Sequence, residues 1–178
     1  GSKAVLIELP PRVRMKLDSP GPVIGTCQGV WPGIQVLAGG AHKAAPTGSP
    51  WIDTNSGFIR AVRAWSDAAV WIGNRPPPRT VVTAQRYLQV ISDAAMAGAR
   101  WVIALDDDLH RRLMARDGEA VKTWESLGRH LKYYEEHREL RSYLPYSRLA
   151  LIQDPADGGM LSGGIIDMLA ARHIPLRS

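Results

Sequence analysis

Three consecutive aspartates, Asp106–Asp108, follow directly after the apolar run Trp101–Leu105. Two carboxylates beside a glycosidic bond can act as acid and nucleophile, or as acid and base, and their separation sets the stereochemistry. Crowded carboxylates also raise one another's pKa, as a general acid requires. The alternative is that Asp108 caps a helix beginning at Leu109 while its neighbours are solvated. We take Asp106 and Asp107 as candidate catalytic residues.

Hard carboxylate oxygens could also bind Mg²⁺ or Ca²⁺. The sequence has no second acidic cluster with ligand spacing, so we expect neither a metal site nor another cofactor. His110 is the histidine best placed for acid–base work, because it follows the acidic triplet. No nucleophile elbow, phosphate loop or Rossmann glycine fingerprint occurs in the chain.

A second candidate cluster contains Trp31 and Trp51, which stand among small and turn-forming residues. An exposed indole can stack on the apolar face of a sugar ring, and Asp53 and Asn55 add a carboxylate and an amide beside it. The alternative is that Asp53, Thr54 or Asn55 caps the next helix and that both tryptophans lie in the core. The candidate substrate-binding residues are Trp31, Trp51, Asn55 and Asn74, and Asp53 is a third candidate catalytic residue.

These candidates are positioned by short apolar runs that stop at polar or turn residues. The runs cover residues 23–26, 70–73, 101–105 and 149–152, and a further strand-like run covers 4–7. Strands buried on both faces read as continuous apolar runs, and their alternation with helical patterns is typical of a parallel sheet. Ligands collect at the carboxyl ends of such strands. We therefore predict an α/β fold built from βα units.

Apolar spacing predicts helices over residues 55–67, 80–97, 109–115, 119–143 and 161–172. We expect Thr80 to cap the second helix and Gly98 to end it. Its apolar stripe is Ala84, Leu88, Ile91 and Ala95, and that of the long fourth helix is Val121, Trp124, Leu127, Leu131 and Tyr134. We interpret the fourth helix as an outer cover on a sheet, and residues 37–50 as a loop.

The chain has 178 residues, of which 45% are apolar, which suits one core-bearing domain or one domain plus part of another. No apolar stretch is long enough to span a bilayer and no signal peptide is visible, so we expect no membrane partner and leave the localisation open. The net charge of +5 permits anion binding. Because the basic residues are scattered, we do not expect nucleic acid binding.

Several segments together resemble a known family. Among them are "PTGSPWIDTNSGFIRAVRA", "WIGNRPP" and "AGARWVIALDD". They resemble the later βα units of glycoside-hydrolase-like (β/α)8-barrel proteins of bacteria, in which the barrel runs into a doubly wound, amidotransferase-like domain. The stretch from "SRLALIQD" to "LSGGIIDMLAARHIPLRS" is similar to the opening βαβ of that second domain.

The resemblance covers about residues 23–178. We therefore predict barrel-like βα units over residues 3–145 and the opening βαβ of a second, incomplete doubly wound domain over 146–178. The implied activity is hydrolysis of a glycosidic bond, with Asp53 or the Asp106–Asp108 group at the barrel mouth. The chain is shorter than the roughly 250 residues of a complete barrel, so the expectation is a carbohydrate-binding or glycoside-hydrolase-like fragment that is catalytically incomplete.

Two other functions stay open. Residues 174–178 look like the start of a further strand, which suggests a piece of a longer protein with an exposed sheet edge. Such an edge could make the chain a non-enzymatic interaction module or a homo-oligomer. The glycines between Gly158 and Gly164 could instead admit an anion to a helix N-terminus, as in a nucleotide- or phosphate-binding α/β domain.

Overall fold

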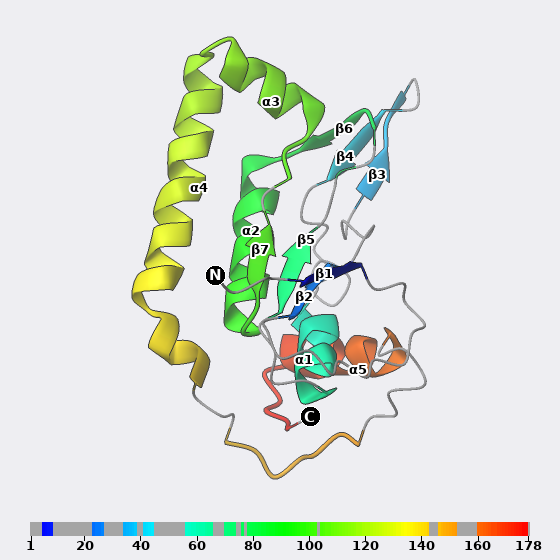
Figure 1. Cartoon of the computed structure of the whole chain (residues 1–178). Helices are drawn as coiled ribbons and strands as arrows, with labels where there is room; N and C mark the ends of the chain where they lie inside the picture. The colour runs from blue at the N-terminus through cyan, green and yellow to red at the C-terminus, as the bar shows by residue number, and fades with distance from the viewer. Residues whose placement is uncertain are drawn as a thin grey trace.

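The computed structural model describes residues 5–8, 23–26, 34–38, 41–44, 56–65, 70–73, 76, 78–102, 104–142, 146–152 and 160–177. Over these ranges the chain is a mixed α/β protein in which short strands alternate with helices (Figure 1). The α/β class predicted from the sequence is therefore confirmed.

The predicted parallel pairing is present in two strand pairs. β1 (Val5–Glu8) lies parallel to β2 (Val23–Thr26), and β5 (Trp71–Gly73) lies parallel to β7 (Arg100–Val102). β2 also contacts β5. The predicted run over residues 101–105 was too long, because Ala104 and Leu105 lie beyond the end of β7.

A three-stranded sheet was not predicted. β3 (Ile34–Val36) pairs antiparallel with β4 (His42–Ala44), which in turn lies parallel to β6 (Thr80–Val82). The interpretation of residues 37–50 as a loop was therefore wrong at β4. These strands are only three residues long. They are stabilised by pairing with other segments, and the periodicity of apolar residues along the sequence does not predict such pairing.

α1 (Ser56–Trp65) and α2 (Ala84–Met96) fall where helices were predicted. The prediction that Thr80 caps α2 was wrong, because Thr80 belongs to β6 and Thr83 Oγ1 accepts the N–H of Arg86 at 3.2 Å. The predicted stop at Gly98 is confirmed by its φ of +86°, a left-handed conformation that favours glycine.

The buried face of α2 differs from the predicted stripe. Its buried residues are Arg86, Tyr87, Val90, Ile91, Ala94 and Ala95, whereas Ala84 is exposed. The stripe was right at Ile91 and Ala95 and wrong at Ala84, because the face is centred on Tyr87 and Val90. Tyr87 and Trp101 then meet in the core with their ring centroids 5.8 Å apart.

α3 (Asp107–Met114) leads into α4 (Gly118–Glu136), which ends before a 3₁₀ turn over Arg138–Ser142. α4 packs on α2 and α3 and stands on the outside of the molecule (Figure 1). Of its predicted apolar face, Leu127 is fully buried, but Trp124 is 43% exposed. On the solvated surface of α4, Lys132 Nζ lies 3.6 Å from Glu136 Oε1.

α5 (Met160–Ala171) lies beside α1, although the two helices are far apart in the sequence (Figure 1). The segments that flank α5 pair with each other in parallel at Ala150 and Arg177. Leu151 N donates to Arg177 O at 2.8 Å, and Arg177 N donates to Leu149 O at 2.9 Å. The strand-like character predicted for both flanking segments therefore appears as one short parallel bridge.

Candidate functional site

The structure describes two of the seven predicted site residues. Asp106 and Asp107 lie at the carboxyl side of β7, where the chain enters α3. The other predicted residues, Trp31, Trp51, Asp53, Asn55 and Asn74, lie outside the described residues. The geometry of the site is therefore the geometry of the acidic turn and its neighbours.

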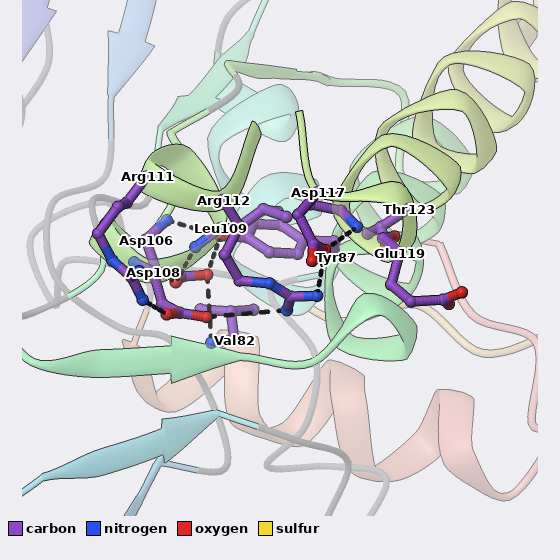
Figure 2. Close-up of polar contacts among 11 residues, drawn as sticks. Val82, Tyr87, Asp106, Asp108, Leu109, Arg111, Arg112, Asp117, Glu119 and Thr123 are labelled. Atoms are coloured by element: carbon purple, nitrogen blue, oxygen red, sulfur yellow. Dashed lines mark hydrogen bonds and ion pairs between the residues drawn. The ribbon is translucent and has the colours of Figure 1, made fainter. Parts of the chain in front are cut away.

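Asp106 is 2% exposed, and both of its carboxylate oxygens accept hydrogen bonds (Figure 2). Oδ1 accepts the backbone N–H groups of Asp108 and Leu109, each at 3.0 Å. Oδ2 accepts the hydroxyl of Tyr87 at 2.7 Å and the N–H of Val82 at 3.3 Å. Four donors from α2, α3 and β6 thus converge on one carboxylate, which offsets the cost of burying it.

The Oδ1 contacts make Asp106 the N-cap of α3. Its side chain satisfies N–H groups that the first turn of a helix leaves without partners, and its charge suits the positive end of the helix dipole. The alternative considered from the sequence, a cap at Asp108, lies two residues beyond the observed cap. Asp108 lies in the first turn of α3, where it forms ion pairs with Arg111 and with Arg112.

Tyr87 completes the environment of Asp106 through a reciprocal contact. Its hydroxyl donates to Asp106 Oδ2 and accepts the backbone N–H of Asp106, both at 2.7 Å. Burial raises the pKa of Tyr87 far above its usual value, and the Asp106 carboxylate also raises it, so the phenol stays protonated and keeps donating.

Asp107 differs from Asp106 in every respect that matters for ligand contact. It lies on the first turn of α3 and is exposed to solvent, as is His110 one turn further along. Because the oxygens of Asp106 are occupied by protein donors, Asp107 is the carboxylate of this pair that a ligand can reach. Asp106 fixes the start of α3 and so fixes the position of Asp107.

The polar network continues from α3 into α4. Arg112 Nη2 lies 2.6 Å from Asp117 Oδ1, which also accepts the N–H of Ala120 at 2.9 Å and so caps α4 (Figure 2). The Ala120 N–H and the Arg112 guanidinium hold the pKa of Asp117 below its usual range. These contacts fix the angle between the two helices.

Ser92 and His130 also combine residue types that catalysts use. Ser92 Oγ lies 2.8 Å from His130 Nε2, but it also donates to the carbonyl of Leu88 at 3.0 Å. A hydroxyl has one proton, so while Ser92 donates to Leu88, the contact with His130 requires the tautomer that carries the proton on Nε2, and that direction is the reverse of nucleophile activation. We assign the pair a structural role in holding α4 on α2.

Sequence reasoning missed Tyr87 and Val82. Tyr87 carries a usable signal, because it precedes the buried Ile91 and Ala94 by four and seven residues and so belongs to the same helix face. Val82 contributes only a backbone N–H, for which no side-chain pattern exists. A cap at Asp106 also fits the preference for aspartate immediately before a helix.

Within the described ranges, no group of three or more histidine, cysteine, aspartate or glutamate side chains is arranged to hold a metal ion. None of the helices described is both long and apolar enough to cross a membrane. Comparison of the chain with protein-family models, with curated proteins and with solved structures gave no match.

Proposed function

We propose that this chain binds carbohydrate at the edge where β5 and β7 end, as a fragment of a glycoside-hydrolase-like barrel protein. The observation that carries the proposal is the acidic turn on the carboxyl side of β7, with Asp107 exposed to solvent. In parallel βα arrangements this edge is where ligands bind.

The contacts between strands support the barrel-like order of parallel strands that the proposal requires. β1 pairs in parallel with β2, β2 contacts β5, and β5 pairs in parallel with β7. This order in space follows the order in the chain, as in successive strands of a barrel. In the proposal these strands are consecutive barrel strands, and residues 146–178 open a second, doubly wound domain.

The two aspartates have different roles in the proposed site. Asp107 contacts the hydroxyl groups of the sugar, since its carboxylate is exposed. Asp106 is a positioning residue, because its four hydrogen bonds hold the first turn of α3. The further sugar contacts proposed from the sequence are those of Trp31, Trp51, Asp53, Asn55 and Asn74, which lie outside the described residues.

Isothermal calorimetry of the full chain against a panel of β- and α-linked oligosaccharides tests the proposal. We expect binding to at least one glycan and a loss of roughly tenfold in affinity in Asp107→Asn, the size of a hydrogen bond to a charged group. Trp51→Ala should weaken binding further if its indole stacks on the sugar.

Glu119→Gln is the matched control, because it also replaces an exposed carboxylate by an amide in the first turn of a helix, on α4. Its affinity should equal that of the parent chain. Failure to bind every glycan, with an unchanged circular dichroism spectrum, would remove the proposal. So would equal affinities of Asp107→Asn and the parent chain.

A further inference from the structure

One side of α4, which stands on the outside of the molecule, has an exposed glycine at its centre (Figure 1). We call it the Gly128 face; its residues are Trp124, Glu125, Gly128, Leu131 and Lys132, which are spaced so that they share one side of the helix. Trp124 is 43% exposed, Leu131 is partly buried, and the other three residues are exposed.

The packing of the chain on itself does not require a glycine at residue 128. A Cβ there would have no neighbouring atom of the described residues within 4 Å. Glycine in the middle of a helix is less favourable than alanine, because it loses more backbone freedom on folding. A position without a side chain does let the backbone of a second helix approach closely.

Two opposite charges lie on the same edge of the Gly128 face. Glu125 comes three residues before Gly128, and Lys132 comes four residues after it. Glu125 forms no ion pair with the described residues. Lys132 Nζ lies 3.6 Å from Glu136 Oε1, but both side chains are more than half exposed, so this pair contributes little. Both charges can therefore form ion pairs with a partner.

The Gly128 face is complementary to itself when a second copy of the chain lies antiparallel to the first. A two-fold axis beside Gly128 brings Glu125 of each copy opposite Lys132 of the other. The same rotation brings Trp124 of each copy opposite Leu131 of the other. Both pairs are centred within one residue of Gly128 in the sequence, so a single register provides the charged and the apolar contacts together.

Charge also disfavours the alternative arrangements and occupants. Parallel helices would bring Glu125 opposite Glu125 and Lys132 opposite Lys132, which is repulsive. A nucleic acid or an anionic lipid surface would attract Lys132 but repel Glu125. A different protein would have to carry the same charges in the reverse order, and a second copy of this chain already does.

We propose that the chain forms a homodimer in which two α4 helices pack antiparallel across Gly128. This inference does not depend on carbohydrate binding. The contact covers about two turns of each helix and its charges are exposed, so the dimer is weak, with a Kd of roughly 0.1 to 1 mM.

Sedimentation equilibrium of the full chain at concentrations up to about 1 mM tests the proposal. We expect a reversible equilibrium between monomer and dimer. Glu125→Lys places a lysine against Lys132 in both contacts, and Lys132→Glu places a glutamate against Glu125 in both. Each variant alone should therefore dimerise about tenfold or more weakly than the parent chain.

An equimolar mixture of the two variants is the decisive measurement. Each contact between a Glu125→Lys copy and a Lys132→Glu copy again joins opposite charges. The mixture should form a heterodimer with a Kd within about threefold of the Kd of the parent homodimer. Residues 125 and 132 are seven positions apart in one helix, too far for direct contact, so an effect within a single copy does not produce this rescue.

Arg129→Glu is the matched control, because it changes the net charge by the same amount as Lys132→Glu at another exposed residue of α4. Arg129 projects about 100° around the helix from Gly128, outside the contact, so this variant should dimerise like the parent chain. All variants should keep the parent circular dichroism spectrum, since the replaced side chains are exposed.

A parent chain that stays monomeric at about 1 mM overturns the proposal, and so does a dimer that neither charge variant weakens. A mixture that does not restore dimerisation rules out the antiparallel pairing of Glu125 with Lys132. An equal loss in Arg129→Glu overturns the proposal by assigning the effect to net charge.

Discussion

The hydroxyl of Ser56, at the start of α1, donates to Asp167 Oδ1 on α5 at 2.7 Å, across 111 residues of sequence. The backbone N–H of Gly57 donates to the same oxygen, also at 2.7 Å. A carboxylate from α5 therefore caps α1 and connects the C-terminal segment to the first helix. Asp167 is only 7% exposed, and burial raises its pKa above the usual 3.8 despite these two hydrogen bonds and the nearby Arg60.

The raised pKa of Asp167 predicts a pH dependence of stability. A buried acid with a raised pKa binds its proton more tightly in the folded state than in the unfolded state. Its contribution to stability is therefore full below the unfolded pKa of 3.8 and is lost as the pH rises through the folded pKa. Asp167→Asn keeps the acceptor for Ser56 and Gly57 but does not ionise. We expect the melting temperature of Asp167→Asn, relative to that of the parent chain, to increase as the pH rises from 4 to 7.

Asp117→Asn is the control for this experiment, because the pKa of Asp117 is lowered rather than raised. The contribution of Asp117 is present above the unfolded pKa of 3.8 and is lost only as the pH falls below it, so the difference in melting temperature between Asp117→Asn and the parent chain should change little from pH 4 to 7. A difference between Asp167→Asn and the parent chain that does not change with pH would contradict the raised pKa.

Tyr87→Phe should destabilise the fold by about 2 kcal/mol, because it leaves the buried N–H and Oδ2 of Asp106 without the hydroxyl. Urea unfolding measures the change. Tyr133→Phe, on the exposed part of α4, removes the same atom from a side chain that is 50% exposed and should change the stability little. Equal effects of the two variants would show that the Asp106 contact contributes nothing specific.

Asp106→Ala should be more destabilising than Tyr87→Phe, at about 3 kcal/mol. It removes the cap of α3 and leaves Tyr87 and Val82 without their acceptor. Asp107→Ala serves as the neighbouring control, because Asp107 is exposed. Urea unfolding of both variants gives the comparison, and similar losses would rule out the assigned role of Asp106.

Arg116→Gly should stabilise the protein by about 1 kcal/mol, because Arg116 has a φ of +56° in the turn after α3. Glycine adopts this conformation without the steric cost that a side chain causes. Arg116→Ala keeps the cost while removing the charge, so it should resemble the parent chain. The check is the free energy of unfolding of both variants; a gain in Arg116→Ala as large as that in Arg116→Gly would assign the effect to charge.

Gly98→Ala should have the opposite effect and destabilise by about 1 kcal/mol. Gly98 has a φ of +86°, and a Cβ there would meet the guanidinium of Arg63, which donates to Ala97 O at 3.1 Å. Gly128→Ala, in the middle of α4 where a Cβ meets nothing within 4 Å, should instead stabilise. Thermal unfolding distinguishes the two signs.

The sequence by itself determined the features that depend on neighbouring residues. The strands at Val23–Thr26 and Trp71–Gly73 fall on the continuous apolar runs that predicted them. The helices appear near the predicted ranges, and α2 ends at Gly98, because spacing and backbone freedom are local properties.

The tertiary structure decided what depends on distant partners. β4 and β6 are too short to show a pattern and form by pairing with each other across the intervening chain. In the sequence, the three aspartates of Asp106–Asp108 cannot be told apart by residue type. Contacts with Tyr87 and Val82 make Asp106 the buried cap, whereas Asp107 stays exposed. Burial and hydrogen bonding of a residue depend on contacts with segments that are distant in the sequence, and the local spacing of side chains does not predict those contacts.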